Sequence, residues 1–252
     1  MYNFFKYLLF RPVVRFLFRG TVEGAENIPQ TGGALLASNH IAAGETFITP
    51  ALIRRPVTFP AKAELFKGNR GLGSKILAWF MKSIKQVPLD RAGGRVSLEG
   101  LGPVLQVLDE GGLVGIYPEG TRSPDGRLYK GHTGVARMAL AAGVPVIPVA
   151  AFNTGTIKGL FGIPWINRPR VVIGKPLDFS AYAGQHDDRA TLRWVTDEVM
   201  ASIQELSGQT YVEAYASSVK RGSLSAAEAD ARVQERPGLG ATPPPLPSGK
   251  LS

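Results

Sequence analysis

The sequence contains no cysteine and only three histidines. The absence of cysteine excludes disulfide bonds, thiolate metal sites and a cysteine nucleophile together. Three histidines argue against a metal site built from several imidazole rings. We therefore expect no bound metal, and a chemistry that depends on oxygen and nitrogen groups.

Several common enzyme motifs are also missing. The sequence has no G-x-S-x-G elbow, no H-E-x-x-H helix, no Walker loop and no G-x-G-x-x-G fingerprint. These absences argue against serine hydrolases, zinc proteases of the H-E-x-x-H type and the usual nucleotide-dependent kinases.

The apolar N-terminal segment lacks an uncharged span long enough to cross a bilayer, which takes roughly 20 residues. Residues 1–20 are rich in aromatic side chains, and four basic residues interrupt them: Lys6, Arg11, Arg15 and Arg19. The small-residue cleavage pattern of a secretory signal is missing, so we expect the segment to be retained. In a helix the three arginines share one face, which is typical of an interfacial membrane helix, and Pro12 would kink or split it. A helix that covers an apolar groove of its own domain is the alternative.

The chain is basic, with 29 lysines and arginines against 20 acidic residues and a formal net charge of +9. Such a charge attracts phosphate-rich surfaces, which include both nucleic acid and anionic lipid. The basic residues are spread along the chain, and no signature of a nucleic-acid-binding fold accompanies them. We therefore expect membrane lipids as partners and no nucleic acid.

Short apolar runs alternate with longer helical patterns through residues 21–219. Strands are predicted at 34–37, 57–60, 84–89, 113–117, 146–151 and 170–173. Helices are predicted at 72–82, 95–109, 133–142 and 188–206. This alternation predicts one α/β domain, with a mostly parallel or mixed sheet flanked by helices and a functional site in the loops at strand ends. Residues 220–252 are small, polar and proline-rich, and we expect them to form a disordered or extended tail.

The first candidate catalytic residues follow the predicted strand at 34–37. The strand leads into His40, and Glu45 comes five residues later, before a helical stretch. A loop that enters a helix can bring these two side chains together. A carboxylate that accepts a hydrogen bond from one imidazole nitrogen fixes the tautomer and prepares the other nitrogen to take a proton. The pair is therefore a candidate base for a substrate hydroxyl, and a structural histidine that caps the loop is the alternative.

A second group of polar residues leaves the predicted strand at 113–117. The Thr121 and Ser123 hydroxyls, the Arg122 guanidinium and backbone N–H groups near Gly120 can bind a phosphate together. Glu119 can hold either the arginine or the loop.

Two further cations, Lys62 and Arg91, follow other predicted strands. With Arg122 they make three cations at the same edge of one sheet, which predicts an anion site. Each of them is alternatively an exposed charge at a strand end.

Residues 34–151 resemble the glycerolipid acyltransferase family, whose best-known member is 1-acyl-sn-glycerol-3-phosphate acyltransferase. The resemblance rests on four blocks in order: Asn39-His40 with Glu45, V-P-L-D-R at 87–91, Y-P-E-G-T-R-S at 117–123, and V-P-V-I-P-V at 144–149. In the family the first block pairs histidine with aspartate. Here the acid is Glu45, which is one methylene longer.

The resemblance implies that His40 is the general base and Glu45 the acid that orients it. It also implies an acceptor-phosphate pocket lined by Arg91, Glu119, Gly120 and Arg122. The implied donor is an acyl-CoA or acyl carrier protein thioester, with no covalent acyl-enzyme, no metal and no other cofactor.

The expected function is the transfer of a fatty acyl group to lysophosphatidic acid, which gives phosphatidic acid. We expect this enzyme at the cytoplasmic face of the cell membrane, attached in a peripheral or monotopic way, with membrane lipids, a lysophospholipid acceptor and acyl-CoA as partners. Glycerol-3-phosphate, another lysophospholipid or a glycolipid is the alternative acceptor. An inactive lipid-binding membrane protein is the alternative from another class, because Glu45 departs from the family pattern.

Overall fold

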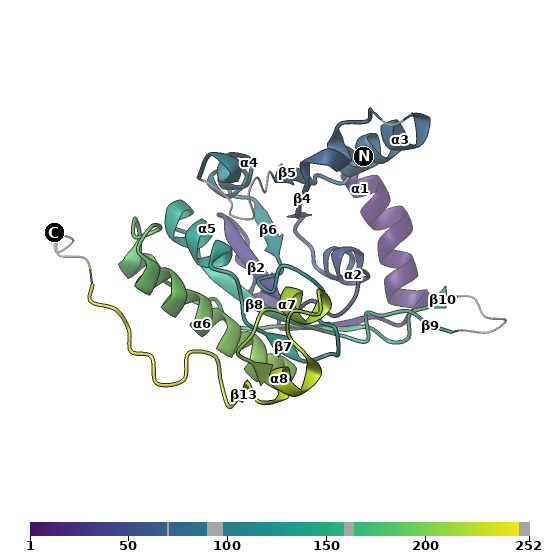
Figure 1. Cartoon of the computed structure of the whole chain (residues 1–252). Helices are drawn as coiled ribbons and strands as arrows, with labels where there is room; N and C mark the ends of the chain where they lie inside the picture. Colours follow the sequence, from purple (N-terminus) through teal and green to yellow (C-terminus); the bar gives the residue numbers. More distant parts are fainter. Residues whose placement is uncertain (70, 90–97, 159–163, 247–252) are drawn as a thin grey trace.

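The computed structural model describes residues 1–69, 71–89, 98–158 and 164–246 (Figure 1). A six-stranded sheet in the order β1-β11-β8-β2-β6-β3 forms its centre. The strands are β1 Thr21–Glu23, β2 Ala34–Ser38, β3 Val57–Thr58, β6 Leu113–Ile116, β8 Val146–Phe152 and β11 Arg170–Ile173. Neighbouring strands run parallel except β8 and β11, which are antiparallel. The predicted α/β class with a mixed sheet is therefore confirmed.

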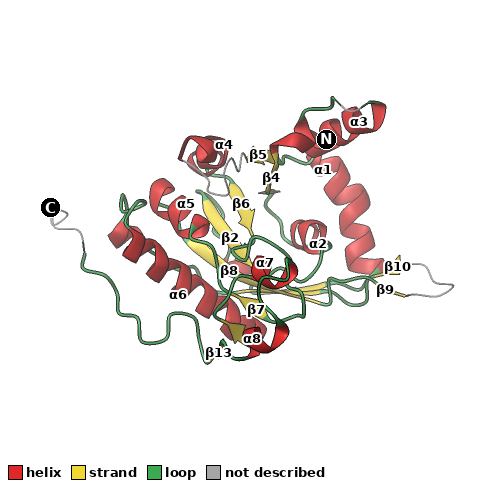
Figure 2. Cartoon of the chain, viewed as in Figure 1, coloured by secondary structure: helices red, strands yellow, loops and turns green. Residues whose placement is uncertain are grey.

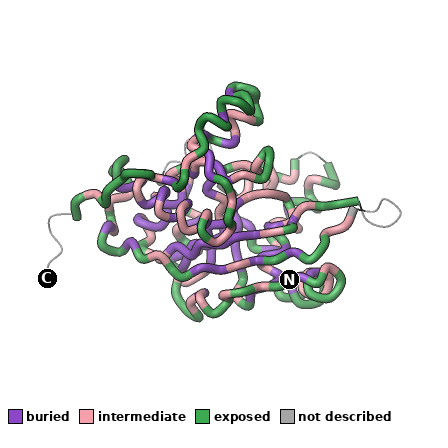
Figure 3. The backbone as a smooth tube through the Cα atoms, turned by 90° about the horizontal axis from the view of Figure 1, so that it is seen from below, coloured by how far each residue is buried: buried purple, intermediate pink, exposed green. Residues whose placement is uncertain are grey.

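Strand β2 lies in the middle of the sheet and is buried on both faces. Leu35 and Ala37 join one apolar core, and Ala34 and Leu36 join the other. Successive side chains of a strand point to opposite faces, so a strand covered on both sides is apolar throughout. The first core contains α4 Leu98–Asp109, α5 Gly134–Ala142 and α6 Arg189–Ser207, and the second contains α2 Glu45–Leu52 (Figure 2). Buried residues follow the central strands, whereas the outer surfaces of the helices are exposed (Figure 3).

The four predicted helices all occur, close to their expected bounds. They are α3 Leu72–Ser83, α4, α5 and α6. Helix α5 ends at Gly143, whose φ of 62° is the left-handed conformation that glycine adopts without strain. Asp188 caps the start of helix α6, and its side chain accepts a hydrogen bond from Thr191 N at 2.7 Å.

The predicted strand at 57–60 is divided between two sheets. Only β3 belongs to the central sheet, and β4 Pro60–Lys62 pairs with β5 Val87–Leu89 in a separate two-stranded sheet. The ring of Phe59 occupies the space above Gly115, where an added Cβ would lie 2.4 Å from the ring. Because this ring packs over β6, the chain leaves the central sheet after Thr58. The prediction that Lys62 and Arg122 share one sheet edge is therefore wrong.

The predicted strand at 84–89 starts later than expected. Ile84 ends helix α3, and Lys85 has a φ of +57°. The chain thus turns at these residues, and only β5 is extended.

The N-terminal helix, residues 2–17, consists of α1 Tyr2–Phe4, η1 Phe5–Phe10 and η2 Val13–Leu17. Pro12 keeps helical angles (φ −59°, ψ −46°), so the run continues through it (Figure 1). Val14 is buried, and Lys6 Nζ donates to Arg54 O at 2.8 Å. Burial lowers the pKa of Lys6 to about 8. One face of this helix therefore covers its own domain, and no helix of the described residues is long and apolar enough to span a membrane.

The segment expected to be a tail is folded in its first part. Strand β12 Tyr211–Val212 pairs with β7 Leu128–Tyr129 and with β13 Val233–Gln234. Helices α7 Ala216–Lys220 and α8 Ala226–Asp230 lie between β12 and β13, and Ser225 with Glu228 forms a capping box on α8. Leu224 and Ala229 are buried against Tyr129 and Val212. The predicted boundary at 219 thus lies inside a folded segment, because a few apolar residues suffice to anchor a polar sequence.

The remaining elements are short. They are β9 Ile157–Lys158, which pairs with β10 Pro164–Trp165, and the 3-10 turns η3 Ala25–Asn27, η4 Ala63–Phe66 and η7 Ser180–Tyr182.

Candidate active site

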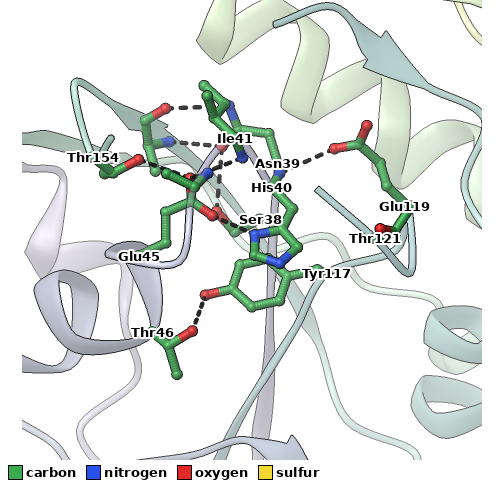
Figure 4. Close-up of polar contacts among 12 residues, drawn as sticks. Ser38, Asn39, His40, Ile41, Glu45, Thr46, Tyr117, Glu119, Thr121 and Thr154 are labelled. Carbon is green, nitrogen blue, oxygen red and sulfur yellow. Dashed lines mark hydrogen bonds and ion pairs between the residues drawn. The ribbon is translucent and has the colours of Figure 1, made fainter. Parts of the chain in front are cut away.

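His40 and Glu45 lie together at the carboxyl end of β2. His40 follows the strand, and Glu45 is the first residue of α2. Their side chains meet, with His40 Nδ1 2.6 Å from Glu45 Oε2 (Figure 4). The Glu45 side chain is fully buried, whereas that of His40 is 16% exposed. The structure therefore brings together the two residues that the sequence analysis paired, and leaves the histidine accessible.

The second oxygen of Glu45 accepts three hydrogen bonds. Its donors are Ile41 N at 2.8 Å, Ala42 N at 2.7 Å and Thr154 Oγ1 at 2.8 Å. Thr154 is almost completely buried and comes from the loop after β8. With Oε1 held in this way, Oε2 stays directed at the imidazole. An ionised carboxylate at Nδ1 requires the proton on Nδ1, which leaves the lone pair on Nε2. No described residue forms a hydrogen bond with Nε2, so this nitrogen is available to a substrate hydroxyl.

Tyr117 forms a flat support under the imidazole. The rings of His40 and Tyr117 stack with centroids 3.9 Å apart and planes 13° apart. Tyr117 in turn stacks on Phe59 at 5.6 Å, and its hydroxyl lies 3.3 Å from Thr46 Oγ1. Burial raises the pKa of Tyr117, so its phenol is neutral. The stack and the bond to Glu45 together fix both the position and the plane of the imidazole.

Glu119 joins the His40 loop to the loop that follows β6. Its oxygens accept His40 N and Tyr129 N, each at 3.0 Å, and Ser123 N donates to His40 O at 2.6 Å. Burial raises the pKa of Glu119 to about 8. Of the two roles considered for Glu119, the structure shows that it holds the loop, because both oxygens bind backbone N–H groups.

The remaining candidates for the anion site are placed differently. Gly120 has a φ of +71°, which turns the chain so that Thr121 and the exposed Arg122 follow at the surface. The Ser123 hydroxyl accepts Gly126 N at 2.9 Å within its own turn. Lys62 ends β4, but its side chain, like the whole of Arg91, lies outside the described residues.

The sequence assigned no role to three supporting residues. Asn39 is fully buried, accepts Ala151 N at 2.8 Å and donates to Gln209 Oε1 at 2.8 Å. Thr154 holds Glu45, and Lys220 Nζ donates to Thr121 Oγ1 at 3.3 Å. A polar asparagine at the end of a buried strand is a usable signal for the first. The other two contacts join residues about a hundred positions apart, so no local pattern predicts them.

The site has the groups that acid–base chemistry needs. A base fixed by hydrogen bonds beside a substrate hydroxyl typically accelerates proton transfer by roughly 10²- to 10⁴-fold. Among the described residues, no group of three or more acidic or histidine side chains could hold a metal ion.

Comparisons with known proteins agree on one family. The family model described as Acyltransferase matches residues 19–151, which is more than half of the chain. A chloroplastic 1-acyl-sn-glycerol-3-phosphate acyltransferase from Arabidopsis thaliana is 33% identical over 62% of this chain and 43% of its own length. A 1-acyl-sn-glycerol-3-phosphate acyltransferase from Bacillus subtilis is 29% identical over 75% of this chain and 88% of its own length.

The fold is also found in a solved structure. The crystal structure of a 1-acyl-sn-glycerophosphate acyltransferase from Thermotoga maritima superposes with a TM-score of 0.57 and 24% identity, covering 78% of each chain. The chain covers less than half the length of two plant relatives. It covers 43% of the Arabidopsis thaliana protein and 45% of a chloroplastic 1-acyl-sn-glycerol-3-phosphate acyltransferase from Brassica napus.

Proposed function

The chain belongs to the acyltransferase family, and we propose that it transfers a fatty acyl group from a thioester to the free hydroxyl of lysophosphatidic acid, giving phosphatidic acid. The observation that carries the proposal is the 2.6 Å contact between His40 and the buried Glu45, beside a loop that presents Arg122. The relatives named as 1-acyl-sn-glycerol-3-phosphate acyltransferases support the choice of acceptor. The proposed donor is acyl-CoA or an acylated carrier protein.

The proposed reaction needs only one proton carrier. His40 Nε2 takes the proton of the acceptor hydroxyl as its oxygen attacks the thioester carbonyl. The carbon–sulfur bond then breaks, and the imidazolium returns the proton to the departing thiolate. Glu45 stabilises the imidazolium between these two steps. Holding the acceptor by its phosphate supplies the positioning that direct attack requires.

A panel of acceptors tests the proposal on the purified protein. One labelled acyl-CoA is offered with lysophosphatidic acid, glycerol-3-phosphate, lysophosphatidylcholine or a glycolipid, and both thiol release and acylated product are measured. We expect acceptor-dependent thiol release with lysophosphatidic acid. Preferential transfer to another acceptor would replace the proposed substrate. Vesicle binding without thiol release for any acceptor would indicate an inactive lipid-binding protein.

Replacing Arg122 with alanine should raise the KM for lysophosphatidic acid roughly ten- to hundredfold. Hydrogen bonds to charged groups contribute about 1.5–3 kcal/mol, and each 1.4 kcal/mol corresponds to a factor of ten. Lysine should restore only part of the affinity, since it lacks the guanidinium fork. Arg170→Ala is the matched control, because Arg170 is an exposed arginine that pairs with Glu23. An unchanged KM in Arg122→Ala would remove Arg122 from the phosphate pocket.

Exposed apolar side chains support membrane attachment through the N-terminal helix and α3. Phe5 contacts Trp79 and Phe80 edge-on, with ring centroids 6.2 and 5.7 Å away, so the two helices lie side by side (Figure 1). The exposed large apolar side chains of these two elements include Phe4, Leu8, Leu9, Phe16, Leu17, Leu72, Ile76 and Trp79. The exposed Arg15 on the N-terminal helix and the exposed Arg19 just after it add attraction to anionic headgroups. We place this surface at the cytoplasmic face of the cell membrane.

The double variant Leu8→Glu/Phe16→Glu should weaken binding to anionic phospholipid vesicles at least tenfold in a flotation assay. Each side chain is largely exposed, at 67% and 78%, and burying such a chain in lipid is worth about 1.5–3 kcal/mol. Val233→Glu, an exposed position on β13, should leave vesicle binding unchanged. Equal losses in both proteins would indicate general charge repulsion and contradict this surface.

A further inference from the structure

The C-terminal segment 211–224 packs against the loop that carries Thr121 and Arg122. Strand β12 pairs with β7, which directly follows this loop, and Lys130 N donates to Ala214 O at 3.0 Å. The ring of Tyr215 stacks on His132 with centroids 4.4 Å apart. His132 also lies against Gly120, where an added Cβ would be 3.0 Å from the imidazole. These contacts fix the start of α7 relative to the loop.

Helix α7 ends at Lys220, whose ammonium lies beside the loop. Lys220 Nζ donates to Thr121 Oγ1 at 3.3 Å. Lys220 is exposed, so the contact lies at the surface that a ligand reaches. The Thr121 oxygen accepts this bond, so its own proton points elsewhere and can serve an anion.

The cations around this loop differ in whether a carboxylate neutralises them. Arg127 pairs with Asp125 and Asp230 at 2.7 Å, and Lys130 pairs with Glu213. Within the part of the chain that the structure describes, Arg122 and Lys220 have no carboxylate within 4.0 Å.

The positive charges of Arg122 and Lys220 repel each other. Loss of solvation and the positive charge of Arg122 lower the pKa of Lys220, whereas Glu119 acts in the opposite direction. Two like charges that form no ion pair with a carboxylate are unfavourable, and an anion bound between them offsets the repulsion. A phosphate monoester suits the pair because it carries up to two negative charges and several acceptor oxygens.

We propose that Lys220, together with Arg122 and Thr121, binds the phosphate monoester of the acceptor lipid. The proposal rests on the proposed acyltransferase function and adds to it a residue from the C-terminal segment. Lysine supplies a compact charge, arginine a planar fork and threonine a hydroxyl donor, so the three groups complement one another. Phosphates of the thioester donor are the other possible source of the same chemistry.

Steady-state kinetics of Lys220→Met distinguish a site for the acceptor phosphate from a site for the donor phosphates. We expect the KM for lysophosphatidic acid to rise roughly tenfold, with kcat and the KM for acyl-CoA within twofold of the wild-type values. The phosphate is remote from the reacting atoms. Losing its contact with Lys220 therefore removes binding that the substrate and the transition state share. Lys220→Arg should keep most of the affinity. A raised KM for acyl-CoA alone, or no change in either KM, would overturn the proposal.

Arg221→Met is the matched control, because Arg221 is the adjacent exposed cation and Arg221 Nε donates to Ser217 O of its own helix at 3.1 Å. It should leave both KM values unchanged. Equal melting temperatures of the variants and wild type exclude a loss of fold.

A binding measurement tests Lys220 independently of turnover. Calorimetry in detergent micelles compares lysophosphatidic acid with a monoacylglycerol of the same chain length. In Lys220→Met, affinity for lysophosphatidic acid should fall about tenfold and affinity for the monoacylglycerol should not change. Wild-type protein that catalyses no transfer would contradict the proposed function. The phosphate site would still stand if Lys220→Met lost affinity for lysophosphatidic acid alone. An equal loss of affinity for both lipids in Lys220→Met, or no loss for either, would overturn the phosphate site itself.

Discussion

Replacing His40 with alanine is expected to lower kcat by roughly 10²- to 10⁴-fold, while the KM for lysophosphatidic acid changes little. The magnitude is that of a general base, since the variant removes the group that is proposed to take the hydroxyl proton. The KM should stay similar because the proposed phosphate contacts come from other residues. Thiol release and product formation by purified protein measure the effect.

The control for this variant is His186→Ala. His186 lies in the segment between η7 and α6, with its Nε2 3.6 Å from Asp187 Oδ2. Its loss should leave kcat within twofold of wild type. Far-ultraviolet circular dichroism and melting temperature establish that His40→Ala is folded, since the substitution also removes the stack on Tyr117. Turnover near the wild-type rate in the folded His40→Ala protein would contradict the mechanism.

The central part of the fold was predictable because its signals are local. Strand β2 is apolar from Ala34 to Ala37 because both of its faces are buried, and helix α5 ends where Gly143 adopts a left-handed conformation. The contact between His40 and Glu45 was also predictable. The two residues lie five positions apart, so a single loop decides whether they meet.

The remaining features depend on contacts that no local pattern encodes. Strand β4 leaves the central sheet because Phe59 packs over Gly115, which follows it by more than fifty residues. Thr154 reaches Glu45 only because β8 pairs with β2. The folded part of the C-terminal segment depends on a few apolar side chains, such as Leu224, within a polar composition. In each case the deciding partner is distant in sequence, so composition and periodicity predict the wrong structure or none.

Replacing Glu45 with glutamine should lower kcat by roughly 10³- to 10⁴-fold, which is more than replacing it with aspartate. In glutamine the carbonyl oxygen would keep the three donors Ile41 N, Ala42 N and Thr154 Oγ1, so the amide NH2 would face His40 Nδ1. Nδ1 must then accept, which puts the ring proton on Nε2 and leaves no lone pair for the substrate. Substituting an amide for the orienting acid of a histidine base has an effect of this size through the same change of tautomer.

The aspartate variant tests geometry where the glutamine variant tests charge. Aspartate keeps the carboxylate but is one methylene shorter, so it cannot hold the three donors and remain 2.6 Å from His40 Nδ1. We expect Glu45→Asp to lower kcat roughly ten- to hundredfold, with the His40 tautomer retained. We therefore predict that kcat decreases in the order wild type, Glu45→Asp, Glu45→Gln, measured on proteins of similar melting temperature. Glutamine as active as aspartate would show that Glu45 holds the loop without orienting the base, and His40 would then need another partner.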